Sequence, residues 1–393
     1  MPAVSGPGGD LLALAAELVA VPSVSHHEAQ LAATVEAAVR EAPHLQVERL
    51  GDTVVARTAF GRAHRLVLAG HLDTVPAVDA AAPVVDGDQL HGLGAVDMKG
   101  GLAVLLDLAC TLTDAAVDAT YVFYACEEVA RRHNSLGQLA RHRPDLLAGD
   151  AAVLAEPTGA VVEAGCQGTV RAVVSLRGRR AHTARPWMGT NAVHRLGPLL
   201  QLLQGYQPRR VVLDGCRYTE QLQAVHVEGG VASNVVPDAA SLTVNYRFAP
   251  DRDATQAGAE LQRLLAPALD AAAGDTLEVQ DVAAGAPPSL TAPLLAELAA
   301  HSGQPPRAKV GWTDVATFWE AGIPATNFGP GDPRLAHTSD EVVSRQQLQQ
   351  VHRVLGAVLR GAPLPPERPA GPAPDSGPAA ADPARGRAGP AGP

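Results

Sequence analysis

The sequence predicts an α/β protein in which a mostly parallel central sheet is interrupted by an inserted βαββαβ sandwich of the ferredoxin-like kind. Between about residues 65 and 155, short continuous apolar runs alternate with helical segments, as in parallel sheets covered on both faces. Near residue 170 the runs become an alternation of apolar and polar residues, which indicates strands with one exposed face. A chain of 393 residues is also too long for one compact core and suits two domains.

The first part of the chain begins with two predicted helices. Residues 9–20 carry apolar groups at helical spacing, and Ser25 followed by Glu28 fits a capping box for a second helix that ends near Arg40. Buried strands and one helix between them follow. They are expected at residues 65–70 (strand), 102–112 (helix), 120–126 (strand) and 151–155 (strand).

The inserted part has six predicted elements in the order of a split βαβ sandwich. It would divide the first domain into residues 1–169 and 282–361, and would itself span 170–281 as an inserted domain. The six elements are a strand at 170–178, a helix at 190–204, strands at about 222–228 and 240–248, a helix at 253–267 and a strand at 276–281.

The last segment, residues 362–393, is almost entirely Pro, Ala, Gly, Arg and Asp and has no aromatic residue. Such a composition buries too little apolar surface to offset the entropy of ordering the chain. We predict a disordered tail there.

The overall composition excludes several classes of partner. A net charge of -10 and a pI near 5.8 argue against binding nucleic acid or an anionic membrane. No apolar run is long enough to span a bilayer, and the first twenty residues lack the pattern of a secretion signal. The four cysteines form no CxxC pair, so we expect reduced thiols and a cytoplasmic protein.

Imidazole and carboxylate groups follow the predicted strands, at the end where parallel strands place their loops in one crevice. This donor set without thiolates suits zinc in a catalytic site, with cobalt or manganese as substitutes. Asp97 is the candidate bridge between two ions, because its two oxygens can each reach one of them. Asp73 can accept the second ring N–H of His71 and fix its tautomer. The candidate residues are His71, Asp73, Asp97, Glu127, Glu128, Glu156 and His337.

Glu127 and Glu128 are adjacent, so both stay ionised only if cations neutralise them or one takes a proton. Where a strand ends, the backbone turns. One of the two carboxylates can then bind metal while the other faces the reacting water. A glutamate in that position is what a general base requires.

With these residues assembled, the chain resembles the M20 family of dinuclear zinc peptidases and deacylases over roughly residues 10 to 360. Within that family it is most similar to the succinyl-diaminopimelate desuccinylases of the actinobacterial type. The matching stretches are residues 68–76, 92–101, 125–128, 154–169, 178–197, 233–248, 310–318 and 327–341.

The resemblance implies a zinc-peptidase-like catalytic domain at residues 1–169 and 282–361 and a dimerisation or lid domain at 170–281. It also implies a role for each candidate ligand. One zinc ion would be held by His71 and Glu156, and the other by Glu128 and His337. Asp97 would bridge the two ions. It further implies that Asp73 orients His71, that Glu127 is the general base, and that the Asp97–Met98 peptide bond is cis.

The resemblance also implies functional residues outside the metal site. His182, in the inserted domain, would reach the active site of a partner subunit and stabilise the oxyanion, which makes a homodimer the expected active form. Asn234 and Arg247 match positions that bind substrate, and Thr313 is a further candidate. Arg247 suits a substrate carboxylate, because its planar fork bonds both oxygens.

One departure concerns residues 165–168, which read Gly-Cys-Gln-Gly. Proteobacterial desuccinylases carry an arginine pair between two glycines there. An arginine contact to substrate is therefore missing from this chain. Arg171 and Arg334 are candidates to replace it.

The activity implied by the resemblance is hydrolysis of N-succinyl-LL-2,6-diaminopimelate to succinate and LL-2,6-diaminopimelate, in the biosynthesis of lysine and meso-diaminopimelate. The metal ligands do not separate this activity from that of an acetylornithine deacetylase, aminoacylase or carboxypeptidase of the same family. A non-catalytic ligand-binding protein is the alternative from another class. The presence of Glu127 with all five metal ligands argues against it.

Overall fold

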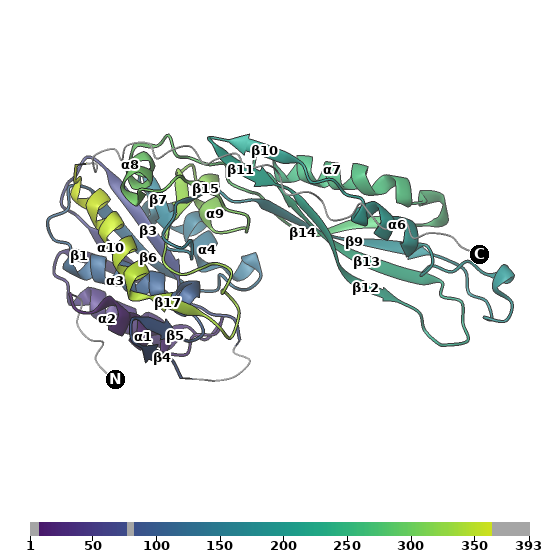
Figure 1. Ribbon diagram of the computed structural model, residues 1–393, viewed down its shortest axis with the longest axis horizontal. Coiled ribbons are helices and arrows are strands. Elements are labelled where there is room, and N and C mark those ends of the chain that lie inside the picture. Colours follow the sequence, from purple (N-terminus) through teal and green to yellow (C-terminus); the bar gives the residue numbers. More distant parts are fainter. Residues whose placement is uncertain (1–7, 77–81, 364–393) are drawn as a thin grey trace, which may run out of the picture.

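The computed structural model describes residues 8–76 and 82–363 and has two lobes (Figure 1). The first lobe is built on an eight-stranded sheet and the second on a four-stranded sheet. Across the larger sheet the strands are β1 (Leu45–Leu50), β2 (Thr53–Thr58), β6 (Asp118–Tyr124), β3 (Arg65–His71), β7 (Ala151–Leu154), β16 (Ala325–Asn327), β8 (Glu163–Ala164) and β15 (Arg307–Ala308).

The centre of the larger sheet is parallel, because β3 pairs in parallel with both β6 and β7, and β7 pairs in parallel with β16. Antiparallel pairs occur toward the edges, at β1–β2, β2–β6 and β16–β8. The predicted α/β fold with a mostly parallel sheet is confirmed. Leu66 and Leu68 of β3 belong to the core on one face, and Val67 and Ala69 to the core on the other. Burial on both faces is why the strand reads as a continuous apolar run.

Helices cover both faces of this sheet (Figure 1). A small three-stranded sheet, β17 (Val342–Ser344), β5 (Gln89–His91) and β4 (Val84–Asp86), lies beside them. One face of the eight-stranded sheet packs against α1 (Leu11–Val19), α2 (Ala29–Arg40), α3 (Gly100–Thr111), α8 (Pro293–Ser302) and α10 (Arg345–Arg360). The other face of this sheet packs against α4 (Ser135–His142), α5 (Pro144–Leu147) and α9 (Val315–Glu320).

The predicted capping box at the start of α2 is wrong. Glu28 occupies the N-cap position but makes no side-chain cap hydrogen bond. Instead, the Ser25 hydroxyl donates to Asp73 Oδ2 at 2.8 Å, and Glu28 Oε1 accepts from the Cys126 amide at 3.0 Å. Both side chains serve buried tertiary contacts, which outweigh the local capping signal because a buried amide or carboxylate without a partner is costly.

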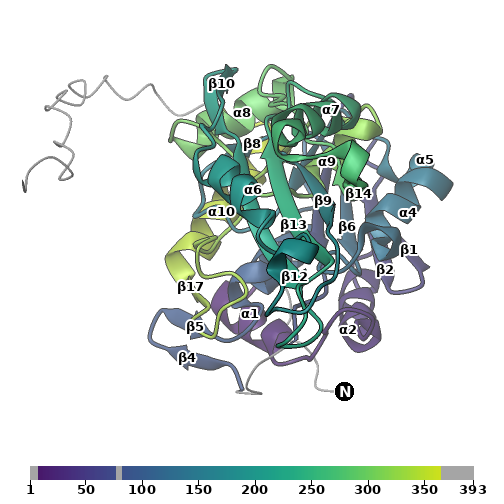
Figure 2. The same cartoon turned by 90° about the vertical axis from the view of Figure 1, so that its right-hand side faces the viewer.

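The second lobe contains a four-stranded antiparallel sheet in the order β12-β13-β9-β14 (Figures 1 and 2). Helices α6 and α7 share one apolar core with β9 and β13. We call residues 168–283 the lid. Its status as a separate domain, at boundaries 170–281, stays a prediction. Its elements are β9 (Gly168–Arg177), α6 (Leu196–Gln204), β12 (Gln221–Gly229), β13 (Ala239–Phe248), α7 (Ala254–Leu265) and β14 (Thr276–Ala283).

The lid follows the expected βαββαβ order, with α6 starting later than predicted and one hairpin added. The hairpin consists of β10 (Arg210–Leu213) and β11 (Cys216–Thr219). Asp214 and Gly215 join its strands with positive φ angles of 45° and 78°. A two-residue Asp-Gly turn is a strong hairpin signal, and it was available in the sequence.

Hydrogen bonds hold both the connecting segments and the hairpin of the lid at the first lobe. Just before and just after the lid, Cys166 and Ala286 exchange main-chain hydrogen bonds of 2.9 and 3.1 Å, which pair the two connecting segments. From the hairpin, the Tyr218 hydroxyl donates to the Ala164 carbonyl oxygen at 2.6 Å. Within residues 8–76 and 82–363, no helix is long and apolar enough to cross a bilayer. The predicted disordered tail lies almost entirely outside the described residues.

Candidate metal centre

The five predicted metal ligands lie where the central strands end. His71 is the last residue of β3, Glu128 follows β6, and Glu156 follows β7. Asp97 lies in an irregular turn, Ala95–Lys99, that leads into α3, and His337 lies in the loop between β16 and β17. Because these loops leave the carboxyl edge of the parallel strands, residues far apart in sequence converge there.

The described residues form three overlapping groups of potential ligands, and two of these groups contain the five predicted metal ligands. One oxygen or nitrogen atom from each of His71, Asp97 and Glu156 lies within 4.8 Å of the others, and the same holds for Asp97, Glu128 and His337. Asp97 belongs to both groups. The structure therefore brings all five residues close together, in groups that match the two sets implied by the resemblance, while their roles as metal ligands stay a prediction.

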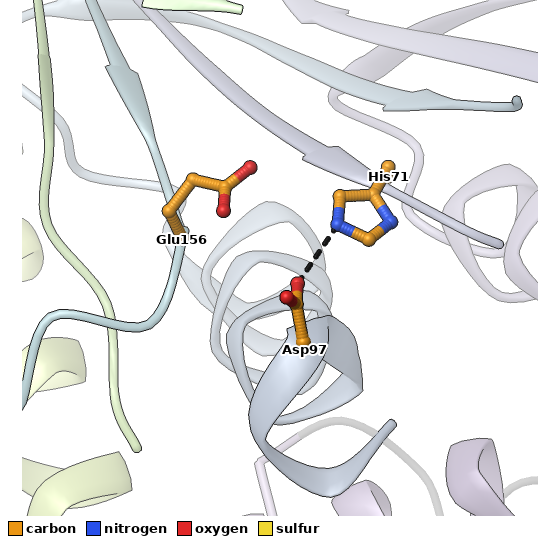
Figure 3. A group of neighbouring side chains, drawn as sticks. All are labelled: His71, Asp97 and Glu156. Atoms are coloured by element: carbon orange, nitrogen blue, oxygen red, sulfur yellow. Dashed lines mark hydrogen bonds and ion pairs between the residues drawn. The ribbon is translucent and has the colours of Figure 1, made fainter. Parts of the chain in front are cut away.

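The two carboxylate oxygens of Asp97 face different histidines. His71 Nε2 lies 3.0 Å from Asp97 Oδ1, and His337 Nε2 lies 3.5 Å from Asp97 Oδ2 and 2.8 Å from Glu128 Oε1. Figure 3 shows Glu156 on the opposite side of the space from His71, with Asp97 between them. Among the described residues, Glu156 Oε1 is buried and has no hydrogen-bond partner. An unpartnered carboxylate oxygen among imidazole and carboxylate groups fits a divalent cation.

The raised pKa values of the buried carboxylates also indicate that the site favours a bound positive charge. Burial, together with the neighbouring Asp97, raises the pKa of Glu156 to about 7. Burial raises the pKa of Glu127 well above its ordinary value, and Glu156, Asp314 and Glu128 raise it further. Hydrogen bonds to Asp97 and Glu128 raise the pKa of His337 to about 10. Without cations, these groups are stable only when several of them hold protons.

We therefore predict that metal binding releases protons. At pH 7, below the His337 pKa of about 10 and close to the Glu156 pKa of about 7, His337 carries a proton and Glu156 is partly protonated in the metal-free protein, whereas a bound cation needs neutral imidazole and ionised carboxylate. Filling the site should release on the order of one to three protons per chain. Calorimetric titration at pH 7 in buffers of different ionisation enthalpy measures this number. Identical heats in all buffers would contradict it.

Asp73 supports both His71 and the adjacent glutamates. His71 Nδ1 lies 3.0 Å from the main-chain oxygen of Asp73 and 3.6 Å from its carboxylate Oδ1. The Asp73 carboxylate accepts hydrogen bonds of 3.0 Å from the amides of Glu127 and Glu128, and of 2.8 Å from the Ser25 hydroxyl. Asp73 thus joins the histidine to the glutamate turn. Ser25 was not predicted to be part of the site, because its sequence context resembles a helix cap.

The glutamate turn itself depends on Cys126, whose φ of +61° bends the backbone after β6. Glu28 Oε1 accepts from the Cys126 amide at 3.0 Å and from its thiol at 3.3 Å. Burial raises the pKa of this thiol to about 12, which keeps it protonated and unreactive. Glu127 and Glu128 each also place an oxygen within 4.8 Å of a His71 nitrogen, so Glu127 faces the same space as the metal ligands.

The loop that carries Glu156 rests on a buried cation that the sequence analysis did not assign to the site. Lys309 Nζ lies 3.0 Å from Glu163 Oε2 and donates to the Pro157 carbonyl oxygen at 3.2 Å. Arg307 adds a hydrogen bond of 2.9 Å to Glu163 Oε1. The only sequence signal was that Lys309 is one of two lysines in the chain.

The predicted substrate and oxyanion residues of the lid lie outside both ligand groups. His182 is exposed, between β9 and α6, and its Nδ1 accepts a hydrogen bond of 3.0 Å from the Ala184 amide. Asn234 is exposed too, and its main-chain oxygen accepts from the Thr183 amide at 3.1 Å. Their roles stay predictions.

The other two substrate candidates, Arg247 and Thr313, differ in whether their side chains are already engaged within the protein. Arg247 lies on β13, opposite Thr169 of β9, on the sheet face that α6 and α7 do not cover. Burial lowers the pKa of Arg247, as expected for a guanidinium that has lost part of its hydration. Thr313 is buried, and its hydroxyl already donates to Asn327 Oδ1 at 2.9 Å.

Neither arginine suggested as a substitute for the missing pair is free of carboxylates. Arg171 lies 3.9 Å from Asp281 in the lid, and Arg334 forms a 2.5 Å ion pair with Asp332 in the loop before His337. Gln167 is buried and donates to the Thr219 carbonyl oxygen at 3.0 Å. The segment around Gln167, where this chain lacks the arginine pair, therefore packs into the protein.

The cis peptide bond expected at Asp97–Met98 is present.

The sequence is similar to those of known proteins over most of its length. A putative succinyl-diaminopimelate desuccinylase of Mycobacterium tuberculosis is 50% identical over 340 residues, which cover 85% of this chain and 94% of that protein. A succinyl-diaminopimelate desuccinylase of Corynebacterium glutamicum is 44% identical over 357 residues, covering 89% and 96%.

The fold is shared with solved structures of much lower sequence identity. The aminopeptidase PepT of Bacillus cereus superposes with a TM-score of 0.72 at 17% identity, covering 89% of this chain and 97% of the other. The model described as Peptidase family M20/M25/M40 matches residues 67–361. This match includes all the ligands described above. The chain belongs to Peptidase family M20/M25/M40.

Proposed function

We propose that the protein is a succinyl-diaminopimelate desuccinylase. It would hydrolyse N-succinyl-LL-2,6-diaminopimelate to succinate and LL-2,6-diaminopimelate, in lysine and meso-diaminopimelate biosynthesis in the cytoplasm. The observation that carries the proposal is the pair of three-residue ligand groups that share Asp97, with Glu127 facing the same space. The names of relatives at 50% and 44% identity support the choice of substrate.

Two zinc ions per subunit are the proposed cofactors, with cobalt as a substitute. His71 and Glu156 would hold one ion, Glu128 and His337 the other, and Asp97 would lie between them. When bound, such a pair of cations supplies a water of low pKa and polarises the scissile carbonyl group. This donor set of imidazole and carboxylate groups is common in catalytic zinc sites.

Glu127 is the proposed general base. It is half-buried, so protein surrounds the carboxylate but solvent still reaches part of it. The Glu127 carboxylate would remove a proton from the attacking water and return it to the leaving amine. Its main chain is held in place by the hydrogen bond from its amide to Asp73, which limits the positions that the carboxylate can take.

We propose that the lid completes the active site of a second subunit. The support is that His182 is exposed and belongs to none of the ligand groups of its own chain. In a homodimer, His182 would donate a hydrogen bond to the oxyanion of the partner's reaction. Arg247 would bind a substrate carboxylate, and Asn234 and Thr313 would complete the pocket.

The substrate assignment is tested by relative turnover. Metal-free protein is titrated with zinc, and kcat/KM is measured for N-succinyl-LL-2,6-diaminopimelate, N-acetylornithine, simple N-acyl amino acids and dipeptides. We expect the succinylated substrate to be preferred. A higher kcat/KM for another amide would assign the chain to a different deacylase or a carboxypeptidase. Failure to cleave any amide, with metal bound, would favour a non-catalytic ligand-binding protein.

The role of His182 gives a second prediction. His182→Ala should lower kcat by about a hundredfold, because removing one oxyanion donor typically costs about 3 kcal/mol. Zinc content should not change. His226→Ala, which removes another exposed histidine of the lid, is the matched control. Wild-type turnover in the His182 variant would remove this residue from the mechanism.

Mixing variants tests whether His182 acts across subunits. In a heterodimer of His182→Ala and Glu127→Gln chains, one site combines an intact Glu127 with an intact His182 from the partner. Random exchange of subunits should therefore restore about a quarter of wild-type activity from two nearly inactive proteins. If mixing restores no activity although heterodimers form, His182 does not act in trans.

A further inference from the structure

We propose that Glu341 is a positioning residue that holds the bridging carboxylate of Asp97 in place and links it to the loop of His337. The inference rests on the two-cation site of the proposed function. Glu341 is not itself within the ligand groups. It would act on the metal pair only through the backbone that carries Asp97.

Glu341 is buried, with 1% of its surface exposed, and a single carboxylate oxygen collects three main-chain donors. Its Oε2 accepts from the amides of Gly94 at 2.9 Å, Val96 at 3.0 Å and Asp97 at 3.3 Å. Hydrogen bonds to an ionised acceptor are about twice as strong as those between neutral groups. The carboxylate therefore fixes the backbone of Asp97 and of the residues immediately before it.

These three amides converge only because the backbone takes an unusual path. Gly94 has a φ of +82°, and a Cβ atom there would lie 2.7 Å from Thr74 Cγ2. Asp97, with φ −122° and ψ 95°, and Met98, with φ −133° and ψ 35°, both depart from helical geometry inside this turn. A normal helical turn would place these amides along its axis rather than around one oxygen. Glu341 thus stabilises a conformation that the local sequence does not favour.

The same residue belongs to the segment that carries the second histidine. Glu341 follows His337 by four residues and directly precedes β17, which pairs with β5. Its main-chain oxygen also accepts from the Gly92 amide at 3.2 Å. Glu341 therefore connects two ligand loops through both its side chain and its backbone. We infer that Glu341 sets the position of Asp97 relative to His337. Both residues belong to the ligand group of Asp97, Glu128 and His337.

The test replaces Glu341 with Met, which has a similar volume but no oxygen acceptor. Zinc affinity is measured on metal-free protein by competition with a chromophoric chelator, and ligand geometry by the visible absorption of the Co²⁺-loaded protein. We expect the weaker ion to lose about 10- to 100-fold in affinity, as is typical when a group that supports a metal ligand is removed. The Co²⁺ spectrum should change as well.

Two further variants separate positioning from a general effect on folding. Glu341→Gln keeps an oxygen acceptor and should retain most of the affinity for both ions. Gly94→Ala leaves Glu341 intact but disturbs the same turn, because its Cβ atom meets Thr74. It should lower the affinity for the weaker ion in the same way, which provides a second measurement if the Met variant does not fold.

Asp118 provides a matched control at the opposite end of the central strands. It is also a buried carboxylate that holds a loop, accepting from the amides of Phe60 at 2.8 Å and Arg62 at 2.9 Å. Asp118→Asn should lower Tm but leave both zinc affinities unchanged.

Wild-type affinities for both ions in Glu341→Met would overturn the proposal, as would an equal loss in Asp118→Asn. If the wild-type protein itself does not bind two ions, the metal assignment fails. If it binds two ions but cleaves no succinylated substrate, only the proposed substrate fails, and the test of Glu341 is unaffected.

Discussion

Glu127→Gln should lower kcat by about 10²- to 10⁴-fold, the range typical for loss of a general base. The amide has nearly the same shape as the carboxylate but cannot accept the proton of the attacking water. The Glu127 main chain should stay in place, because the hydrogen bond from its amide to Asp73 does not involve the side chain. We therefore expect zinc content close to that of the wild-type protein, measured together with steady-state kinetics on the succinylated substrate.

Metal analysis decides whether Glu127 and Glu128 have been assigned correctly, since both place an oxygen near His71. Of the two glutamates, Glu128 forms an ion pair with His337, with Oε1 at 2.8 Å from Nε2, which supports its assignment as the ligand. If Glu127→Gln loses an ion, the roles of the two glutamates are reversed. Glu320→Gln, at an exposed residue paired with Arg131, controls for the change of charge and should have no effect on either measurement.

Asp97→Asn should have the largest effect on metal binding. An asparagine presents one neutral oxygen and an NH₂ group, so it cannot offer an anionic oxygen to each of two cations. In the structure the two oxygens of Asp97 already face different histidines, at 3.0 and 3.5 Å. We expect zinc content, measured by elemental analysis after gel filtration, to fall from about two ions to fewer than one per chain.

The same variant should lose the stabilisation that zinc provides. A ligand that binds only the folded protein stabilises it by about 2.7 kcal/mol at one hundred times its Kd, so zinc should raise Tm of the wild-type protein. This increase should be small or absent in Asp97→Asn. Asp332→Asn, which changes a half-buried aspartate paired with Arg334, should keep it. Two tightly bound ions in Asp97→Asn would show that Asp97 is not the bridge.

The fold could be predicted well where local sequence and burial agree. Continuous apolar runs such as residues 65–70 become strands buried on both faces, because no polar residue interrupts them. The prediction failed where tertiary contacts compete with local signals. Ser25 and Glu28 have the sequence of a capping box, but their side chains bind Asp73 and Cys126 instead. The hairpin at Asp214–Gly215 had a local signal that was not used.

The sequence by itself determined the α/β class and the order of the six predicted lid elements, because apolar runs and their alternation are local properties. The five candidate ligands and their division around Asp97 came from the resemblance to a known family. Only the tertiary structure decided which residues hold those candidate ligands in place. The Glu341 carboxylate and the Asp97 amide are 244 residues apart, yet they lie 3.3 Å from each other. Such contacts depend on the packing of whole loops, and no spacing within a segment indicates them.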